Sequence, residues 1–360
     1  MKKSMTLALA LLSFSGLASA QSSVTVFGVV DIPVSRYTVS GGQRWTGEGM
    51  SGLGNSRLGF RGSEDLGGGM RASFWLEGGF NPPDGTAGSG FAFTRRSTLS
   101  LTGSWGEIRL GRDYTPKFLI DGWFDPFWGT GIGEQVIMIA GTTGTSPGRQ
   151  QWATGFGANY PTSLRSSNMI GYFLPGGLGG FYGQFQFAPA EQTAPGSKQG
   201  QFMGTLLGYR SGPLNVSMGY NKTMGANPVT AAAPTITTVN LASTYKFSFG
   251  TLFDELSYET YARPTSKNTS RGYLVGFIAP VGALDLKASY STVRIDLGGT
   301  PTASKVALGF VYNLSKSTAL YGTAASTRNQ SGALLTVSPY VTGIANATSS
   351  GYEAGINKRF

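Results

Sequence analysis

The sequence predicts an all-β protein, a 16-stranded antiparallel transmembrane β-barrel. Short stretches in which apolar and polar residues alternate recur along the whole chain, as strands with a lipid face and an aqueous face require. Charged residues make up only 13% of the chain, well below the roughly 25% of soluble domains. The mean hydropathy is nevertheless −0.05. After residue 20, no apolar run approaches the roughly 18 residues of a membrane-spanning helix.

Residues 1–20 have the organisation of a secretory signal peptide. Lys2 and Lys3 precede an apolar stretch, and Ala18, Ser19 and Ala20 form a small-residue cleavage site. We therefore expect an exported mature chain, residues 21–360, that forms a single barrel domain. Without the two lysines, 26 basic and 18 acidic residues remain, which gives the mature chain a net charge of +8.

The clearest strand pair lies within residues 55–80. In its first arm Arg57, Gly59 and Arg61 alternate with Leu58 and Phe60, and the second arm alternates in the same way. The stretch SEDLGGG between the arms favours a tight turn. One face of the hairpin is apolar and the other is charged, which fits a barrel wall between lipid and a water-filled lumen. An amphipathic hairpin of a soluble β-sandwich would show the same local pattern.

Sixteen stretches alternate in this way, an even number, as in a closed barrel of one chain. They are 23–35, the two arms within 55–80, 91–102, 107–114, 168–174, 181–187, 201–210, 214–222, 237–247, 252–263, 271–280, 284–295, 305–314, 318–328 and 351–360. Short turns alternate with longer connections between them. Outer-membrane barrels have this asymmetry, and a soluble sandwich has no reason to maintain it.

One connection, residues 115–167, is much longer than the others. Irregular loops of more than about 15 residues are usually functional or disordered. This loop is rich in large aromatic residues, which argues against disorder: Phe118, Trp123, Phe124, Phe127 and Trp128. The sheltered surface of a barrel is its inner wall, so we expect the loop to fold inward and pack there.

Four segments of the chain resemble segments of one known family. They are SSVTVFGVVD, SRLGFRGSEDLGGGMRASFWLE, FTRRSTLSLTGSWGEIRLGRDYTP and the C-terminal GYEAGINKRF. The resemblance is to the trimeric general-diffusion porins of Gram-negative outer membranes, especially the betaproteobacterial branch. It implies sixteen strands, a homotrimer, and a third external loop that narrows the pore. Residues 115–167 have that loop's place, although they lack the family's usual Pro-Glu signature.

The resemblance also implies a row of basic residues on the barrel wall at the narrowest point, where a pore selects its solutes. The arginines that match the family's are Arg57, Arg95 and Arg112. Three more are added from their positions: Arg61 shares the face of Arg57, Arg165 lies near the end of the long loop, and Arg36 lies at the rim of the first strand. The apolar residues of the stretch 91–101 share the face of Arg95, which would direct Arg96 into the lumen instead. Both assignments stay open.

The acids expected to face this row are Asp121, Asp125 and Glu134 of the long loop. A field between loop carboxylates and wall arginines would orient polar solutes as they pass. Because the mature chain carries a net charge of +8, we expect a pore that prefers anions. The resemblance implies passive diffusion of small hydrophilic solutes and inorganic anions, with no catalytic site, and no motif calls for a cofactor or metal.

The last strand ends in an aromatic residue. The resemblance implies that Phe360, with Tyr352 on the same face, forms the signal recognised by the barrel-assembly machinery. Lys358 interrupts this apolar face and has to snorkel. Outer-membrane lipid and lipopolysaccharide are the other expected partners. The export signal excludes nucleic acid.

Other functions fit the sequence less well. The chain has no histidine or cysteine, which excludes the barrel hydrolases that use histidine as a base. The stretch 129–133, GTGIG, lacks the strand-to-helix context and the lysine of a phosphate-binding loop. A channel specific for sugars, phosphate or organic acids is the main alternative, because the loop aromatics could form a stacking track instead of wedging the loop in place. A plugged structural barrel or adhesin is the third.

Overall fold

The computed structural model describes residues 23–87, 90–138, 164–190, 198–225, 234–263, 266–296 and 299–360. The expected signal peptide 1–20 and residues 139–163 of the long loop lie outside these ranges. In the described part of the chain nearly all regular structure is β-strand, and each strand pairs antiparallel with its neighbours. None of the described helices is long and apolar enough to span a membrane.

The strands follow one another along the chain with two short helical segments after the sixth. They are β1 (Ser23–Val39), β2 (Arg44–Glu48), β3 (Arg57–Gly67), β4 (Met70–Gly79), β5 (Arg96–Gly103), β6 (Gly106–Tyr114), α2 (Pro116–Trp123), η1 (Gly131–Gly133), β7 (Arg165–Phe173), β8 (Phe181–Ala188), β9 (Phe202–Ser211), β10 (Leu214–Met224), β11 (Thr235–Phe247), β12 (Gly250–Arg263), β13 (Ser266–Val281), β14 (Leu284–Asp296), β15 (Thr302–Ser315), β16 (Thr318–Gln330) and β17 (Thr348–Arg359).

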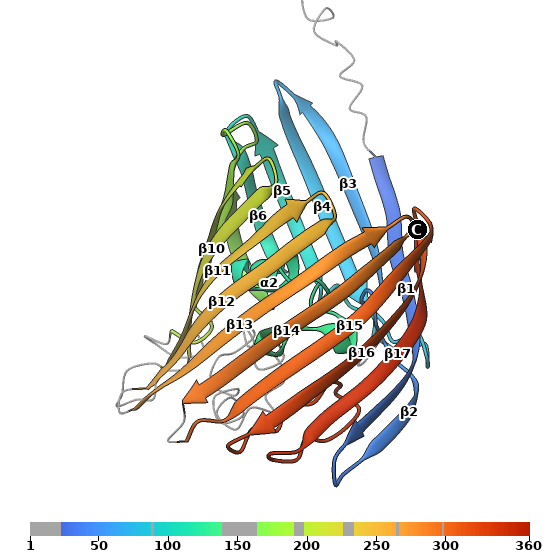
Figure 1. Cartoon of the computed structure of the whole chain (residues 1–360). Helices are drawn as coiled ribbons and strands as arrows, with labels where there is room; N and C mark the ends of the chain where they lie inside the picture. Colours follow the sequence, from blue (N-terminus) through green and yellow to red (C-terminus); the bar gives the residue numbers. More distant parts are fainter. Residues whose placement is uncertain are drawn as a thin grey trace, which may run out of the picture.

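The sheet closes on itself through β1. Residues 29–39 of β1 pair with β17, and residues 23–29 pair with β3 on the other side. From β3 to β17 each strand pairs with the next along the chain. Closure leaves the ring of described strands β1 and β3 to β17 without a free edge, which a sheet in lipid requires. Figure 1 shows tilted strands, with the C-terminus and the short turns at one end and the longer connections at the other.

The predicted 16-stranded barrel is confirmed, with differences at strand ends. The short strand β2 lies outside the ring and pairs with residues 34–38 of β1. The expected strand 91–102 begins only at Arg96, while β1 and β13 extend beyond their expected ends. The five residues of β2 are too few to show a period of two, so alternation did not predict it.

Side chains alternate between an apolar outside and a polar inside. Val24 and Val26 are 68% and 54% exposed, whereas Asp31 on the other face of β1 is buried. On β15, Val306 is exposed while the adjacent Lys305 is buried inside the barrel. Exposed apolar residues on the outer face and polar residues on the lumen face are the arrangement of a barrel in lipid.

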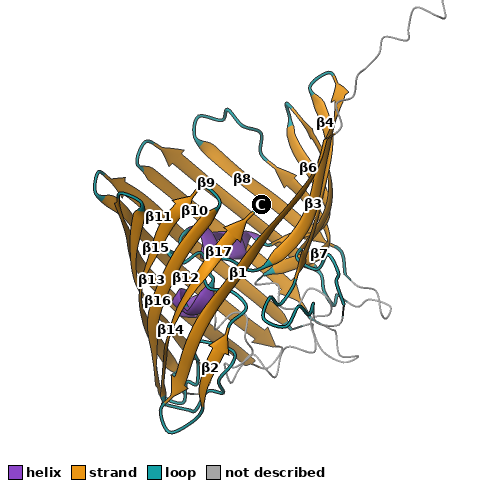
Figure 2. Cartoon of the chain, turned by 90° about the vertical axis from the view of Figure 1, so that its right-hand side faces the viewer, coloured by secondary structure: helices purple, strands orange, loops and turns teal. Residues whose placement is uncertain are grey.

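The described half of the long loop lies inside the barrel. Helix α2 begins where the Thr115 hydroxyl accepts the backbone N–H of Phe118 at 3.3 Å. It lies against β8 to β11, and η1 lies against β15 to β17 on the other side of the ring. Figure 2 shows the helix enclosed by the strands. Residues 115–138 therefore cross the lumen from one wall to the other, as expected for an inward-folded loop.

Glycines of the barrel wall make room for this loop. A Cβ added to Gly219 would lie 2.6 Å from Cδ1 of Ile120, and one added to Gly276 would lie 2.3 Å from Cγ of Pro126. Such distances are too short for any side chain, so the loop packs directly on the wall backbone. Polar contacts add to the packing, for the backbone N–H of Val136 donates to the Ser291 hydroxyl at 3.0 Å.

The C-terminal residue completes the closure of the barrel. The backbones of Phe360 and Gly28 exchange two hydrogen bonds, at 3.0 and 3.1 Å. The ring of Phe360 packs so closely on Gly28 that a Cβ there would lie 2.4 Å from Cζ. Lys358 snorkels as expected, because its Nζ donates to the hydroxyls of Ser317 at 2.9 Å and Thr318 at 3.1 Å in the adjacent short turn.

Candidate functional site

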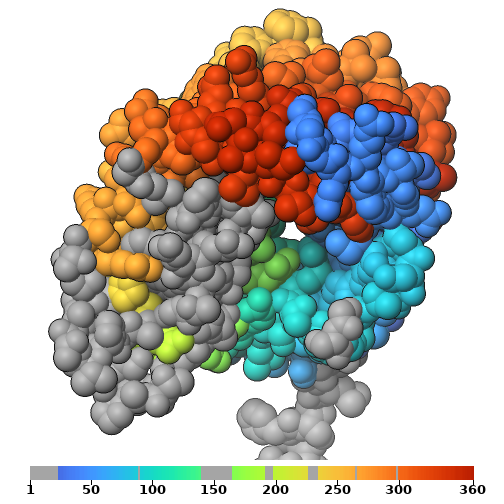
Figure 3. Space-filling model, turned by 90° about the horizontal axis from the view of Figure 1, so that it is seen from below, coloured from blue at the N-terminus to red at the C-terminus, as the bar shows by residue number. Residues whose placement is uncertain are grey.

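The lumen narrows beside helix α2. Seen from the end with the long connections, Figure 3 shows an opening between the N-terminal connections (blue and cyan) and the C-terminal ones (red). A cavity of about 590 Å³ lies inside the barrel, bordered by β3, β4 and β6 on one side, by the loop on the second, and by β14 to β17 on the third. We call it the upper cavity.

Two arginines pair with one acid beside the upper cavity, and a third arginine lies next to them. The Nε of Arg95 donates to Oε1 of Glu77 at 2.6 Å, and the Nε of Arg57 lies 3.6 Å from the same oxygen. Arg95 also donates to the hydroxyl of Tyr114 at 2.8 Å, and Arg165 stacks over the ring of Tyr114 at 4.7 Å. These three arginines are the upper arginine cluster. Only one carboxylate, that of Glu77, pairs with the cluster, through Arg57 and Arg95, so the cluster keeps a net positive charge.

The far side of the upper cavity adds to this charge. Lys287, Lys316 and Arg359 line it there, together with the acid Asp285. With Arg57, Arg95 and Glu77, the lining residues include five cationic and two anionic side chains. A small anion in this cavity meets cations on two sides, which favours its presence over that of a cation.

A second set of arginines lies nearer the short turns. Arg61, Arg96 and Arg109 line a cavity of about 370 Å³ together with Trp75 and Glu107. We call the three arginines the lower arginine cluster and this space the lower cavity. The short turns are taken as the lower end of the barrel, although Figure 1 draws them at the top. The guanidinium groups of Arg61 and Arg96 lie 5.3 and 4.5 Å from the centre of the Trp75 ring. Stacking on an aromatic ring holds a guanidinium in place and leaves its N–H groups available for a solute.

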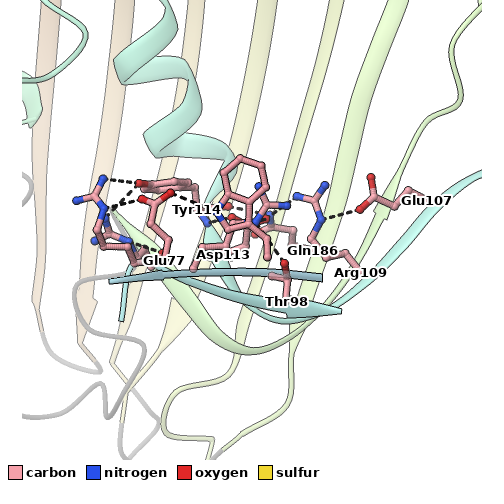
Figure 4. A network of polar contacts seen from close by, with 11 residues as sticks. Glu77, Thr98, Glu107, Arg109, Asp113, Tyr114 and Gln186 are labelled. Atoms are coloured by element: carbon pink, nitrogen blue, oxygen red, sulfur yellow. Dashed lines mark hydrogen bonds and ion pairs between the residues drawn. The ribbon is translucent and has the colours of Figure 1, made fainter. Parts of the chain in front are cut away.

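Acids separate the arginines along this row. Arg109 donates to Glu107 at 2.8 Å and to Asp113 at 2.5 Å, and Arg96 lies 3.5 Å from Asp113. Figure 4 shows Glu77, Asp113 and Glu107 following one another along the row, with Glu107 at its end beside Arg109. The acids reduce the repulsion between neighbouring arginines, so cationic side chains can be packed closely in one wall.

Both arginines of the disputed pair face the lumen. Arg95 precedes the first residue of β5 and is not bound by the strand's alternation, so its side chain reaches Glu77 in the upper cavity. Arg96 is the first residue of β5 and shares its inward face with the buried Thr98 and Ser100. The parity of the strand therefore places Arg96 in the lower cavity and leaves Arg95 in the upper one.

Two other predicted wall residues face outward. Arg112 lies on the face of β6 that carries the exposed Ile108 and Leu110, and donates to the backbone of Thr94 at 2.6 Å. The arginine of this strand that faces the lumen is Arg109, which the family resemblance did not indicate. The alternation of Ile108 and Leu110 with charged residues in the sequence could have predicted its inward orientation.

Arg36 is likewise on the outer face, since its neighbour two residues before, Val34, is 63% exposed. Arg57 and Arg61 do lie inside the barrel and line the upper and the lower cavity. Arg165 contacts Tyr114, which lines the upper cavity.

The expected loop acids do not face the arginine clusters. Asp121 is fully buried, forms an ion pair with Lys117 one turn away, and accepts from Nδ2 of Asn240 at 3.1 Å. Asp125 is also buried and accepts the backbone N–H groups of residues 127, 129 and 135 at 2.9 to 3.2 Å. Burial raises the pKa of Asp125. Both carboxylates therefore hold the loop together. The acid that pairs with the arginines is Glu77, which lies beside them on the barrel wall.

Glu134, the third expected acid, lies at the far end of the crossing. Its backbone oxygen accepts the Nζ of Lys305 at 2.7 Å. Burial raises the pKa of Glu134, and the nearby Lys305 opposes this shift. On the same wall the carboxylate of Glu353 accepts the backbone N–H of Ile132 at 3.1 Å. The loop is thus tied to the wall away from the upper arginine cluster.

The loop aromatics divide between two tasks. Phe124 and Phe127 are buried, with 0% and 6% exposure, and pack against the barrel wall. Phe118, Trp123 and Trp128 line the upper cavity. In the described residues, no group of three or more Asp or Glu side chains is arranged to hold a metal ion.

The architecture, with a loop-narrowed lumen and a charged wall, matches that of known outer-membrane channels. The family described as Gram-negative porin matches residues 6–332. The chain is 38% identical over 373 residues to outer membrane porin protein 32 of Delftia acidovorans, and the match covers 100% of both chains. The chain belongs to the Gram-negative porin family. This porin is accordingly a channel protein of the outer membrane of a Gram-negative bacterium, and not an enzyme.

Solved structures of porins have the same fold. The anion-selective porin from Comamonas acidovorans superposes with a TM-score of 0.83 at 35% identity, covering 94% of this porin and 100% of that chain. The trimer form of OmpT from Vibrio cholerae superposes with a TM-score of 0.66 over 94% of this porin and 99% of that chain. Its identity is only 14%, so this second likeness concerns the fold alone.

Proposed function

We propose that this porin forms a water-filled channel for the passive diffusion of small hydrophilic solutes and inorganic ions, and that it prefers anions. The supporting observation is the excess of cationic side chains in the lumen. Five cationic and two anionic residues line the upper cavity, and three arginines and one glutamate line the lower cavity. The relative described as anion-selective, at 35% identity, is consistent with this preference.

The two arginine clusters would act on an anion in turn. An anion that enters the narrow region loses part of its hydration, and guanidinium N–H groups replace the lost hydrogen bonds. Glu77 holds Arg57 and Arg95 side by side against their mutual repulsion. Because acids lie beside the arginines of each cluster, neither cluster binds the anion so tightly that it cannot leave, which conduction requires.

The test is a measurement of conductance and reversal potential in a planar lipid bilayer under a salt gradient. We expect open channels whose reversal potential lies on the anion side. A reversal potential on the cation side would overturn the anion preference. A protein that inserts without any conductance would overturn the diffusion channel itself.

A channel specific for one class of solute is the second candidate. Five aromatic side chains line the upper cavity: Trp75, Tyr114, Phe118, Trp123 and Trp128. Aromatic rings that line a narrow polar cavity can stack on a sugar or a planar carboxylate. Flux that saturates with one such solute would favour this candidate, and flux that rises linearly with concentration would favour general diffusion.

We further propose that this porin assembles as a homotrimer, with outer-membrane lipid and lipopolysaccharide around it. The resemblance to the trimeric porins implies this assembly, and OmpT from Vibrio cholerae, which shares the fold, has been solved in a trimer form. The exposed Phe360 and Tyr352, 58% and 59% accessible on the outer face, are available to the barrel-assembly machinery before the barrel closes. Crosslinking of the purified protein in detergent tests the trimer, since a monomer would yield no crosslinked trimer band.

A further inference from the structure

One aromatic residue of the inward-folded loop is unusually exposed. Trp128 lies between α2 and η1, and 56% of its surface is accessible, although tryptophan is highly buried on average. Its side chain lines the upper cavity. In the described part of the chain its indole stacks on no other ring, whereas the ring of Trp123 lies 6.4 Å from that of Tyr182. The loop therefore leaves one large aromatic surface open to the solute path.

The backbone of Trp128 is held in an unfavourable conformation. Its φ is +58°, in the left-handed region where a residue with a Cβ is sterically strained. The carboxylate of Asp125 fixes this turn, because it accepts the backbone N–H groups of Phe127 at 2.9 Å and Gly129 at 3.2 Å, on either side of Trp128. Strained conformations persist where the surrounding structure imposes them, and they are common at binding sites. The turn thus presents the indole to the cavity in a fixed position.

The lining around Trp128 combines cations with apolar side chains. Arg57 and Arg95 line the same cavity. Apolar residues of the loop and the wall also line it: Val29, Leu53, Leu119, Val311 and Ala319. An inorganic anion interacts with the cations and hydrogen-bond donors of a pore and gains nothing from apolar surface. An anion that carries an aromatic ring uses both, because its charged end binds guanidinium groups while its ring stacks and leaves water.

Further rings lie directly beside the arginines. Tyr114 and Phe118 both line the upper cavity, and their rings are stacked with centroids 4.6 Å apart. The hydroxyl of Tyr114 accepts a hydrogen bond from Arg95 at 2.8 Å. Cations and aromatic surface are therefore in direct contact at this wall, with Trp128 on the loop. The cavity volume of about 590 Å³ lies within the roughly 300 to 1,000 Å³ of small-molecule sites, so it accommodates a single-ring solute.

We propose that Trp128 is a stacking platform for aromatic carboxylates, which this porin binds more tightly than non-aromatic carboxylates of the same charge and size. The carboxylate group forms charge-assisted hydrogen bonds with Arg57 and Arg95, and the ring lies against the indole of Trp128. Of the solutes that stack on aromatic rings, a carboxylate is favoured over a sugar because a sugar carries no charge for the arginines to bind. This inference rests on the proposed anion channel and names the class of solute that its upper cavity selects.

The experiment compares the block of chloride current by two carboxylates in a planar bilayer. Benzoate has an aromatic ring, and cyclohexanecarboxylate has the same charge and carbon skeleton without aromaticity. For each blocker the concentration that halves the current through the full-length mature porin is measured at constant ionic strength. Trp128→Leu removes the ring but keeps an apolar side chain, and Trp128→Phe keeps a smaller ring. The control is Trp105→Leu, since Trp105 is 38% exposed in the short turn between β5 and β6 and lines neither cavity.

We expect benzoate to halve the wild-type current at about one fifth of the concentration that cyclohexanecarboxylate requires, since aromatic stacking contributes about this factor. The ratio of the two concentrations approaches one in Trp128→Leu, is kept in part by Trp128→Phe, and is kept in full by Trp105→Leu. Because both blockers act on the same channel, a change in its width affects them alike and leaves the ratio unchanged.

Two results would overturn the proposal: equal block of the wild type by the two carboxylates, or a ratio in Trp128→Leu equal to that of the wild type. Block by glucose as strong as block by benzoate would assign the platform to neutral sugars and contradict the proposal as well. A failure of the proposed channel is distinct, because it shows before any blocker is added, as an absent chloride current or a reversal potential on the cation side.

Discussion

Removal of one charge from the upper arginine cluster gives a measurable change in ion selectivity. The variant is Arg57→Gln, whose side chain retains hydrogen-bonding ability without the charge. The upper cavity, about 590 Å³, has the volume of a sphere about 5 Å in radius, so an ion at its centre is about 6 Å from the guanidinium. At this distance in water the interaction of two unit charges is about 0.7 kcal/mol, and screening in 0.1 M salt lowers it to about 0.4 kcal/mol.

This energy applies with opposite sign to anions and cations. Loss of the Arg57 charge raises the energy of an anion in the cavity and lowers that of a cation, so the anion-to-cation permeability ratio falls about fourfold. The assay is the reversal potential across a planar bilayer under a potassium chloride gradient. Because screening weakens the effect, the shift grows as the salt concentration is lowered.

The control is Arg36→Gln, which changes the net charge equally but on the outer face of β1. We expect its permeability ratio to equal that of the wild type. The reasoning is refuted if Arg57→Gln leaves the ratio unchanged at low salt, or if the two variants shift it equally. The second result would mean that total charge, and not charge inside the lumen, determines selectivity.

Three further predictions concern the loop and the closure of the barrel. Gly276→Val places a side chain where Pro126 packs, which displaces the loop and raises single-channel conductance. Phe360→Ala removes the ring that covers Gly28, so a smaller fraction of the protein reaches the folded form that resists detergent unfolding on a gel. Glu134→Gln weakens the pH dependence of the loop's protection from hydrogen exchange. The pKa of Glu134 is raised when the loop is packed inside the barrel, so packing is most favourable in acid. It becomes less favourable as the pH rises from about 4.5, the ordinary pKa, through the raised pKa of the packed loop.

Each of these predictions has a matched comparison. Gly176 lies in a short turn with no neighbour within 4 Å of an added Cβ, so Gly176→Val should leave conductance unchanged. If it raises conductance as Gly276→Val does, loop displacement is not the cause. Tyr352→Ala removes an equally exposed aromatic of β17, and an equal loss of folded protein would show that closure at Gly28 has no special role. Protection of the loop that rises with pH in the wild type would contradict the sign of the Glu134 shift.

Alternation predicted the barrel because each strand has lipid on one side and water on the other. Alternation also predicts which arginines of the barrel wall face the lumen, wherever the strand is regular. Ile108 and Leu110 point outward, so Arg112 does too, and a match to family arginines was a weaker guide than parity. Arg95 lies outside β5, where no alternation applies. Its place beside Glu77 follows from a contact between segments, which a local pattern does not encode.

The loop acids were misplaced for a similar reason. A carboxylate in a pore-lining loop is equally able to face the solute path or to bind the loop's own backbone. The choice depends on what the opposite wall provides. Asn240 and the amide of Gln135, which reaches Glu255 at 2.8 Å, complete a buried polar network around Asp121. Their distance along the chain hides this arrangement from any reading of residues 115–167 alone.

The contacts that seat the loop also bear on the order in which the molecule forms. Gln135 and Glu255 are 120 positions apart, Val136 and Ser291 are 155 apart, and Ile132 and Glu353 are 221 apart. Contacts of such long range form only once the intervening chain is in place, because closing long segments is entropically costly. The partners belong to β12, β14 and β17, the last of which is also the last strand to be synthesised. The narrow part of the channel is therefore the final part of the porin to mature, and an incompletely closed barrel has a wider lumen than the finished one.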